Sequence, residues 1–305
     1  MAKRLGVIDI GTNTFHLLVV DWNQQTTKFE TVIRKRIFVK LGAKNLAHIS
    51  LDAYQRGIKA LATFKEILQA NNCTQYIAFG TAAIRNASNA DQFITEVNDK
   101  LSIKIQKISG DKEAHLIYQG IKLSYPFDDQ PCLIMDIGGG SVEFIIANNH
   151  QVFYAESFLV GAAVLRNQFH QTEPISKQEI RALHLHLDTH LATLKEQLQK
   201  HNPHSLIGAS GTFDILQNEF STKELTPTSS ALDTDNLPAF FKDIASKNLE
   251  QRIATKEIPT TRADLIVVAL LLIEHILQMH HFDQVVVTQY AMKEGMLREM
   301  MQDKH

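Results

Sequence analysis

Two short segments place a carboxylate inside an apolar run of residues. Asp9 lies in "VIDIGTNTFHLLVV", residues 7–20, and Asp136 has the matching position in "IMDIGGGSVEFII", residues 134–146, where Glu143 follows. A buried ionised carboxylate is strongly unfavourable unless it meets a cation or several hydrogen-bond donors. The pattern therefore favours a role in metal or phosphate binding for Asp9, Asp136 and Glu143, and we count all three as candidate metal ligands. The alternative is that each carboxylate caps the N–H groups of its own tight turn.

Polar turns follow both aspartates, and each joins two segments that are expected to be strands. Glycine lets the backbone approach a ligand closely, and successive N–H groups in such a turn bind anions. A third candidate is a strand-to-helix junction, which favours an anion but is also an ordinary helix start. The predicted phosphate-binding residues are Gly11, Thr12, Asn13, Thr14, Gly138, Gly139, Gly140, Ser141, Ser210, Gly211 and Thr212. A P-loop or Rossmann motif is excluded, because each needs a helix directly after its glycine loop.

The elements that must hold these turns repeat once along the chain. In the first half, β-branched runs predict strands, and apolar residues at helical spacing predict helices. The strands are expected at 5–10, 15–21, 28–39, 75–80 and 103–109, and the helices at 50–71, 82–101 and 112–123. The second half predicts strands at 132–138, 142–148, 151–160, 205–210 and 284–289, with helices at 177–200, from 212, at 265–277 and at 290–302.

A polar, proline-containing segment at 124–131 separates the two halves. We therefore expect two α/β domains, 1–126 and 127–305, which face each other across a cleft.

The overall charge gives no sign of a polyanion-binding molecule. Lys and Arg number 31 and Asp and Glu 33, so a polyanion must be held by a local patch. The chain has no nucleic-acid motif and no charge-free apolar segment of membrane-spanning length, so we expect neither a nucleic-acid nor a membrane partner. Cys73 and Cys132 do not make a disulfide framework, which indicates a reducing cytoplasm.

Seven segments resemble, in order, the exopolyphosphatase/guanosine pentaphosphate phosphohydrolase family, written Ppx/GppA. They are "DIGTNTFHLLV", "GTAAIRNASN", "SGDKEAHLIYQG", "DIGGGSVEF", "GASGT", "RADLIVVALLLIE" and "MKEGML", and they span essentially the whole chain. Either aspartate segment alone suggests only the wider actin, Hsp70 and sugar-kinase fold, whereas "SGDKEA" narrows the resemblance to this family. The resemblance implies a short, two-domain form. Both domains would be ribonuclease H-like (the actin-like ATPase fold), with mixed β-sheets flanked by helices and an active-site cleft between them.

The resemblance also implies roles for individual residues. Glu113 corresponds to the catalytic glutamate, Asp136 and Glu143 to a site for Mg²⁺ or another divalent cation, and Arg85 to an arginine that faces the phosphate chain. Hydrolysis of a terminal phosphoanhydride needs a carboxylate that orients or deprotonates water, and cations that offset the phosphoryl charge. Position alone allows simpler roles, because the helix dipole stabilises a glutamate in a first turn and many helix arginines are solvated.

The implied activity is the Mg²⁺-dependent removal of terminal phosphate from inorganic polyphosphate by a water that Glu113 activates. One alternative is hydrolysis of guanosine pentaphosphate (pppGpp) by the same residues. Another, from a different class, is a nucleotide-gated binding protein of the actin or Hsp70 type. A sugar kinase is disfavoured, because no sugar-binding signature is visible. The sequence does not determine the substrate preference or the oligomeric state, and a homodimer is one assembly to test.

Two further features leave alternatives open. Lys112 and His115 stand where the family commonly has a glutamate and an arginine, so Lys112 either helps to hold a polyanion or lies in solvent. A basic segment either steers a long polyphosphate or is the exposed face of a strand. Its residues are Arg34, Lys35, Arg36, Lys40 and Lys44.

Overall fold

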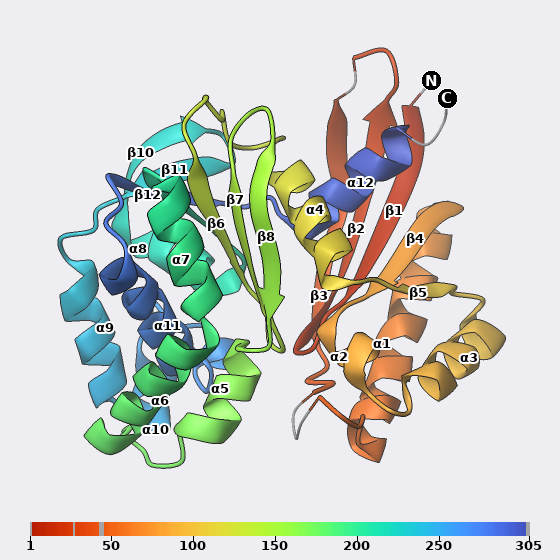
Figure 1. Ribbon diagram of the computed structural model, residues 1–305. Coiled ribbons are helices and arrows are strands. Elements are labelled where there is room, and N and C mark those ends of the chain that lie inside the picture. Colours follow the sequence, from red (N-terminus) through yellow and green to blue (C-terminus); the bar gives the residue numbers. More distant parts are fainter. Residues whose placement is uncertain (1, 27, 43–45, 303–305) are drawn as a thin grey trace. The chain divides into compact units, whose positions relative to one another are not determined.

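A computed structural model describes residues 2–26, 28–42 and 46–302 of the protein (Figure 1). Lys44, one member of the basic segment, lies outside the described residues. The chain divides into two compact units, the first formed by Met1–Gly120 with Met292–His305 and the second by Ile121–Ala291. Of the helices described, none combines the length and the apolar character that crossing a membrane requires.

Among the described residues, unit 1 forms a five-stranded mixed sheet with helices packed on it. Its strands are β1 (Ala2–Ile10), β2 (Thr14–Asn23), β3 (Phe29–Phe38), β4 (Gln75–Gly80) and β5 (Ile105–Lys107). Its helices are α1 (Leu51–Ala70), α2 (Ala82–Asn86), α3 (Ala90–Leu101), α4 (Gly110–Ile121) and α12 (Met292–Gln302). The strand order is β3-β2-β1-β4-β5, in which β1, β2 and β3 form an antiparallel meander and β4 runs parallel to β1.

Unit 2 contains a seven-stranded mixed sheet within the described part of the chain. Its strands are β6 (Cys132–Ile137), β7 (Val142–Ala147), β8 (Val152–Phe158), β9 (Ser205–Ala209), β10 (Ser221–Thr226), β11 (Ser229–Leu232) and β12 (Gln284–Thr288). Its helices are α5 (Ala162–Phe169), α6 (Lys177–His190), α7 (Ala192–His201), α8 (Gly211–Phe220), α9 (Leu237–Ser246), α10 (Leu249–Ala254) and α11 (Ile266–Met279), with a 3₁₀ turn at Thr260–Arg262. The strand order is β10-β11-β12-β9-β6-β7-β8.

The two sheets share one plan. Five strands of unit 2, in the order β8-β7-β6-β9-β12, repeat the order β3-β2-β1-β4-β5 of unit 1, and the same pairs are antiparallel or parallel. This is the ribonuclease H-like order, so the expected fold class of two α/β units with mixed sheets flanked by helices is confirmed. The strands β10 and β11 are an addition at one edge of the second sheet.

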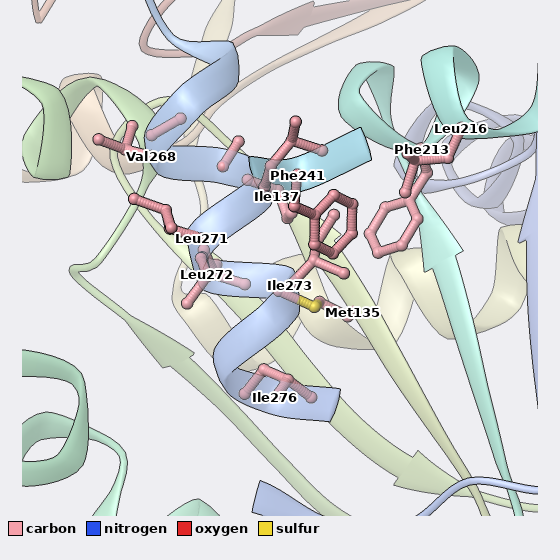
Figure 2. Close-up of a cluster of buried hydrophobic side chains, with 14 of the residues drawn as sticks. Met135, Ile137, Phe213, Leu216, Phe241, Val268, Leu271, Leu272, Ile273 and Ile276 are labelled. Atoms are coloured by element: carbon pink, nitrogen blue, oxygen red, sulfur yellow. The ribbon is translucent and has the colours of Figure 1, made fainter. Parts of the chain in front are cut away.

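Each unit has a core of its own. In unit 1, Leu61, Phe64 and Leu68 of α1 recur at helical spacing and pack with Ile8 and Leu17 of the sheet. In unit 2, α11 is apolar almost all round, and its side chains pack with Met135 and Ile137 of β6 and with Phe213 of α8 (Figure 2). A helix that is apolar on all sides is stable only when it is covered. This explains why the segment at 265–277 is a core helix.

Two expected helices are each divided into two. The segment 82–101 breaks between α2 and α3, because Ala87 is extended and the Asn89 side chain binds both backbone groups of Ile49, at 2.9 Å each. The segment 177–200 breaks at Leu191. Neither α5 nor the β10–β11 hairpin was predicted from the sequence.

The compact units differ from the expected division, 1–126 and 127–305, at two places. The hydroxyl of Ser124 bonds to Thr228 Oγ1 at 2.8 Å and accepts from Thr288 at 2.7 Å, so the polar segment at 124–131 is built into unit 2. The last helix, α12, returns to unit 1, where Arg34 of β3 pairs with Glu294 at 3.1 Å.

Candidate functional site

The first polar turn joins β1 to β2 and is fixed by its own backbone. The N–H of Gly11 donates to the carbonyl of Thr14 over 3.2 Å, and a Cβ at position 11 would lie 2.8 Å from that oxygen, so glycine is required. The carbonyl of Asn13 accepts from the N–H groups of residues 39 and 40, and that of Thr12 from Gly42. No described residue accepts a hydrogen bond from the N–H groups of Thr12 or Asn13, so these two donors are available to a ligand.

The Thr12 side chain is the least satisfied polar group of this turn. Thr12 is only 3% exposed, and no hydrogen bond joins its Oγ1 to any residue that the structure describes. A buried hydroxyl without a partner is costly, so a bound group that hydrogen-bonds to it would stabilise this turn. The first turn therefore fits an oxyanion.

Asp9 is half-buried, which differs from the deep burial that its apolar neighbours predict. It lies at the end of β1, directly opposite His16 of β2. In unit 2 the equivalent ladder position, opposite Asp136, holds Glu143. The two hairpins are thus alike in backbone and different in chemistry, because His16 stands where the second unit has a carboxylate.

Glu113 lies in the first turn of α4 and is 6% exposed. Its backbone N–H donates to the carbonyl of Ser109, and the N–H of Lys112 to the Ser109 hydroxyl, so Ser109 starts the helix. Arg85 of α2 donates from Nη1 to Glu113 Oε2 at 2.9 Å and to the carbonyl of Ile108 at 3.1 Å. The structure therefore pairs the two residues that the resemblance assigns to catalysis and to phosphate binding.

The C-terminal helix α12 holds α4 in place. A Cβ at Gly295 would lie 1.8 Å from the carbonyl oxygen of Leu116, so the two helices touch backbone to backbone at this glycine. Lys112 of α4 forms an ion pair with Glu299 of α12. In the structure, Lys112 is thus part of a helix contact, while His115 is exposed.

The second polar turn, between β6 and β7, repeats the geometry of the first. The N–H of Gly138 donates to the carbonyl of Ser141 over 2.9 Å, and a Cβ at Gly138 would lie 2.8 Å from that oxygen. The start of α5 covers the turn: the N–H groups of residues 161, 162 and 163 donate to the carbonyls of Gly140, Gly138 and Gly139. Within the described part of the chain, the N–H groups of Gly139, Gly140 and Ser141 find no acceptor. They are the donors that this turn offers to an anion.

Gly161 permits this close cover. A Cβ at this position would lie 2.4 Å from the carbonyl carbon of Gly140 and 2.5 Å from the backbone nitrogen of Ser141. Gly161 and α5 were missed from sequence, although the small residues of "VGAA" directly after a strand were a usable signal.

Asp136 and Glu143 are direct cross-strand partners and project from one face of the sheet. Glu143 is 2% exposed, and its Oε1 accepts from the hydroxyls of Ser141 and Ser157, each at 2.7 Å. Asp136 is 7% exposed, and its Oδ1 accepts from the hydroxyl of Ser210. Ser157 was not among the residues predicted from the sequence.

These two carboxylates fit Mg²⁺ better than a metal enclosed by protein. Among the described residues, no group of three or more His, Cys, Asp or Glu is arranged to hold a metal ion. Mg²⁺ usually keeps several waters and binds through one or two carboxylates together with substrate phosphates. Asp136 and Glu143 would supply oxygen ligands of the kind that this mode of binding requires.

The third predicted loop lies at the junction of β9 and α8, as expected. Ser210 has φ 72° and ψ 173°, a backbone conformation that is strained for any residue but glycine and that concentrates at functional sites. Gly211 follows, and a Cβ there would lie 1.6 Å from a guanidinium nitrogen of Arg262. A cation thus lies against the N-terminal turn of α8, at Gly211. Arg262 was missed because only the fold brings it to this helix.

The sequence pattern of the Ppx/GppA phosphatase family matches residues 18–304. An exopolyphosphatase from Cytophaga hutchinsonii is 34% identical, with a TM-score of 0.92, and the match covers 99% of this chain and 98% of that one. The Ppx/GppA family member of Aquifex aeolicus shares the fold at 21% identity, with a TM-score of 0.81 and 100% of both chains covered. The chain therefore belongs to the Ppx/GppA phosphatase family. Its enzyme class is that of the phosphoanhydride hydrolases.

Proposed function

We propose that the protein is an exopolyphosphatase that removes terminal orthophosphate from inorganic polyphosphate in a Mg²⁺-dependent reaction. The observation that carries the proposal is the ion pair of the buried Glu113, at the start of α4, with the half-buried Arg85 of α2. A buried carboxylate beside a guanidinium combines a base for water with a cation for phosphate. The similarity to the exopolyphosphatase of Cytophaga hutchinsonii supports polyphosphate as the substrate.

Glu113 orients the attacking water and accepts its proton. A positioned carboxylate of this kind contributes about 10²- to 10⁴-fold to the rate. Arg85 binds oxygens of the phosphoryl group under attack, because its planar guanidinium can donate two parallel hydrogen bonds. It is already held by the carbonyl of Ile108, which reduces the entropy lost when it binds.

The three loops bind the phosphates through backbone donors. In the turns at 11–14 and 138–141, no described residue accepts from the N–H groups of residues 12, 13, 139, 140 and 141, and residues 210–212 open α8. Helix starts and turns of this type favour anions. Arg262 adds a positive charge at the third loop.

Asp136 and Glu143 would hold the Mg²⁺, and Asp9 remains a predicted further carboxylate for a cation. Bound there, Mg²⁺ would offset the charge of phosphate oxygens. The Ser141 and Ser157 hydroxyls orient Glu143 toward this role.

The test is phosphate release from long-chain polyphosphate and from pppGpp, each with and without Mg²⁺. The proposal predicts metal-dependent release from polyphosphate and a higher kcat/KM for polyphosphate than for pppGpp. Release from pppGpp alone would assign the protein to nucleotide hydrolysis instead. Tight ATP binding without hydrolysis of either compound would favour a nucleotide-gated binding protein.

A further inference from the structure

A row of polar side chains crosses the sheet of unit 1 beside the first turn. His16 of β2 is the direct ladder partner of Asp9 on β1 and of Arg36 on β3. Direct partners on neighbouring strands project from the same face of a sheet. Asp9, His16 and Arg36 therefore form one row, and we call it the Asp9–Arg36 row. Thr14, two residues before His16, lies on the same face.

This face is the one that α12 covers, and neighbouring residues show it. Arg34 is two residues from Arg36, shares its face, and pairs with Glu294 of α12. Lys35 lies between them and projects from the opposite face, where its ladder partner Leu17 belongs to the core with Phe64 of α1. Arg34 and Arg36 thus project from one face of the sheet, and Lys35 projects from the other.

Arg36 is the cation of this row that is left for a ligand. Its side chain is exposed, and no residue in 2–26, 28–42 or 46–302 makes a hydrogen bond or ion pair with it. Arg34, by contrast, is engaged by a fully buried carboxylate. The strand holds the Arg36 backbone in a regular ladder with β2, so its side chain leaves the sheet from a fixed Cα position.

Arg36 is also close to the first phosphate-binding turn. It lies one strand across and two residues along from Thr14, which places the two Cα atoms roughly 8 Å apart from strand spacing and rise. An arginine side chain extends about as far as that. A linear chain of phosphates that begins at the turn can therefore continue over His16 to Arg36.

We propose that Arg36 binds the distal phosphates of a linear polyphosphate, beyond those held by the turn at 11–14. The proposal deepens the proposed function and rests on it. The guanidinium suits the task, because it donates two hydrogen bonds to phosphate oxygens and is always charged. A substrate with few phosphates ends before it reaches this residue, so Arg36 makes the enzyme favour long chains.

The test compares Arg36→Ala with Lys35→Ala, a matched control that removes one positive charge from the adjacent position on the other face. Phosphate release is measured on tripolyphosphate and on long-chain polyphosphate. In parallel, binding of labelled long-chain polyphosphate is measured in EDTA. We expect Arg36→Ala to lower kcat/KM for the long chain and its affinity by about tenfold, the loss of one charge-assisted hydrogen bond. Tripolyphosphate hydrolysis should stay within about twofold. Lys35→Ala should leave both substrates unchanged, and Arg36→Lys should restore part of the affinity.

Equal effects of the two alanine variants would overturn the proposal, because they would show a general charge effect. An equal loss on tripolyphosphate, or a loss only on pppGpp, would also overturn it. These outcomes are distinct from failure of the proposed function, in which the unmodified protein releases no phosphate from polyphosphate at all.

Discussion

Arg85 Nη1 donates to Glu113 Oε2 over 2.9 Å and to the carbonyl of Ile108 over 3.1 Å, so one nitrogen joins α2 to the start of α4. The Glu113 side chain is 8% exposed and the Arg85 side chain 21%. The carboxylate is therefore desolvated and the guanidinium still reaches solvent. A phosphate can approach the arginine from outside, while the glutamate stays shielded.

Arg85→Lys should lower kcat/KM for polyphosphate by about tenfold or more, because lysine keeps the charge and loses the fork that binds two phosphate oxygens. Steady-state phosphate release measures the change. Arg181→Lys on α6, an exposed helix position, is the matched control and should match the unmodified protein. Full activity of Arg85→Lys would show that bidentate binding has no role.

Ser157→Ala should weaken Mg²⁺ binding, so that the reaction needs a higher Mg²⁺ concentration. It removes one of the two hydroxyls that donate to Glu143 Oε1, and loss of a partner of a metal ligand typically costs about 10- to 100-fold in metal affinity or activity. A Mg²⁺ titration of the phosphate-release rate measures the shift. Ser246→Ala on α9, whose hydroxyl bonds only to the carbonyl of Asp243 among the described residues, is the control. An unchanged Mg²⁺ titration for Ser157→Ala would argue against Glu143 as a ligand.

Gly295→Ala should reduce kcat, because the new methyl group forces α12 away from Leu116 of α4, the helix that carries Glu113. Overpacking of this kind costs about 1–3 kcal/mol of stability. Gly57→Ala in α1 is a matched control, since its Cβ would lie 2.9 Å from the Phe93 ring in the same unit. The two variants are compared by thermal unfolding and by kcat. A kcat loss no larger for Gly295→Ala than for Gly57→Ala, at equal stability loss, would contradict a positioning role for α12.

The free energy of unfolding should fall as the pH is lowered below about 6.5, the ordinary histidine pKa. Burial lowers the pKa of His170 and of His275, so the unfolded chain binds protons more readily than the folded chain. The stability contributed by these two neutral rings is therefore fully present above the histidine pKa of the unfolded chain, and it is lost as the pH falls through and below that value. Urea unfolding between pH 8 and roughly 5.5 measures the slope.

His170→Phe should reduce that slope, because it removes a titrating ring that is fully buried. His281→Gln, at a side chain that is 91% exposed, is the control and should leave the slope unchanged. A stability that is independent of pH in this range would contradict the burial effect.

The hairpins and their order were predictable because local residue types decide them. Gly11 and Gly138 mark turns in which only glycine avoids the carbonyl three residues on, and the flanking apolar runs are strands. The start of α4 at Ser109 was likewise visible in "SGDKEA".

Other features depend on contacts between segments far apart in the sequence. Arg262 reaches Gly211 only through the fold, and α12 belongs to unit 1 through Gly295, which a pattern of apolar residues does not reveal. The half-buried position of Asp9 has a similar cause. It lies at the end of a strand, on the face with His16, where the strand no longer has full cover.

The most direct test of Glu113 as the base is the turnover of Glu113→Gln on long-chain polyphosphate, measured together with its affinity for the same substrate. The amide has the same shape and can still accept from Arg85, but it cannot take a proton from water. We expect kcat to fall by about 10²- to 10⁴-fold, with polyphosphate binding retained. Turnover equal to that of the unmodified protein would contradict Glu113 as the base.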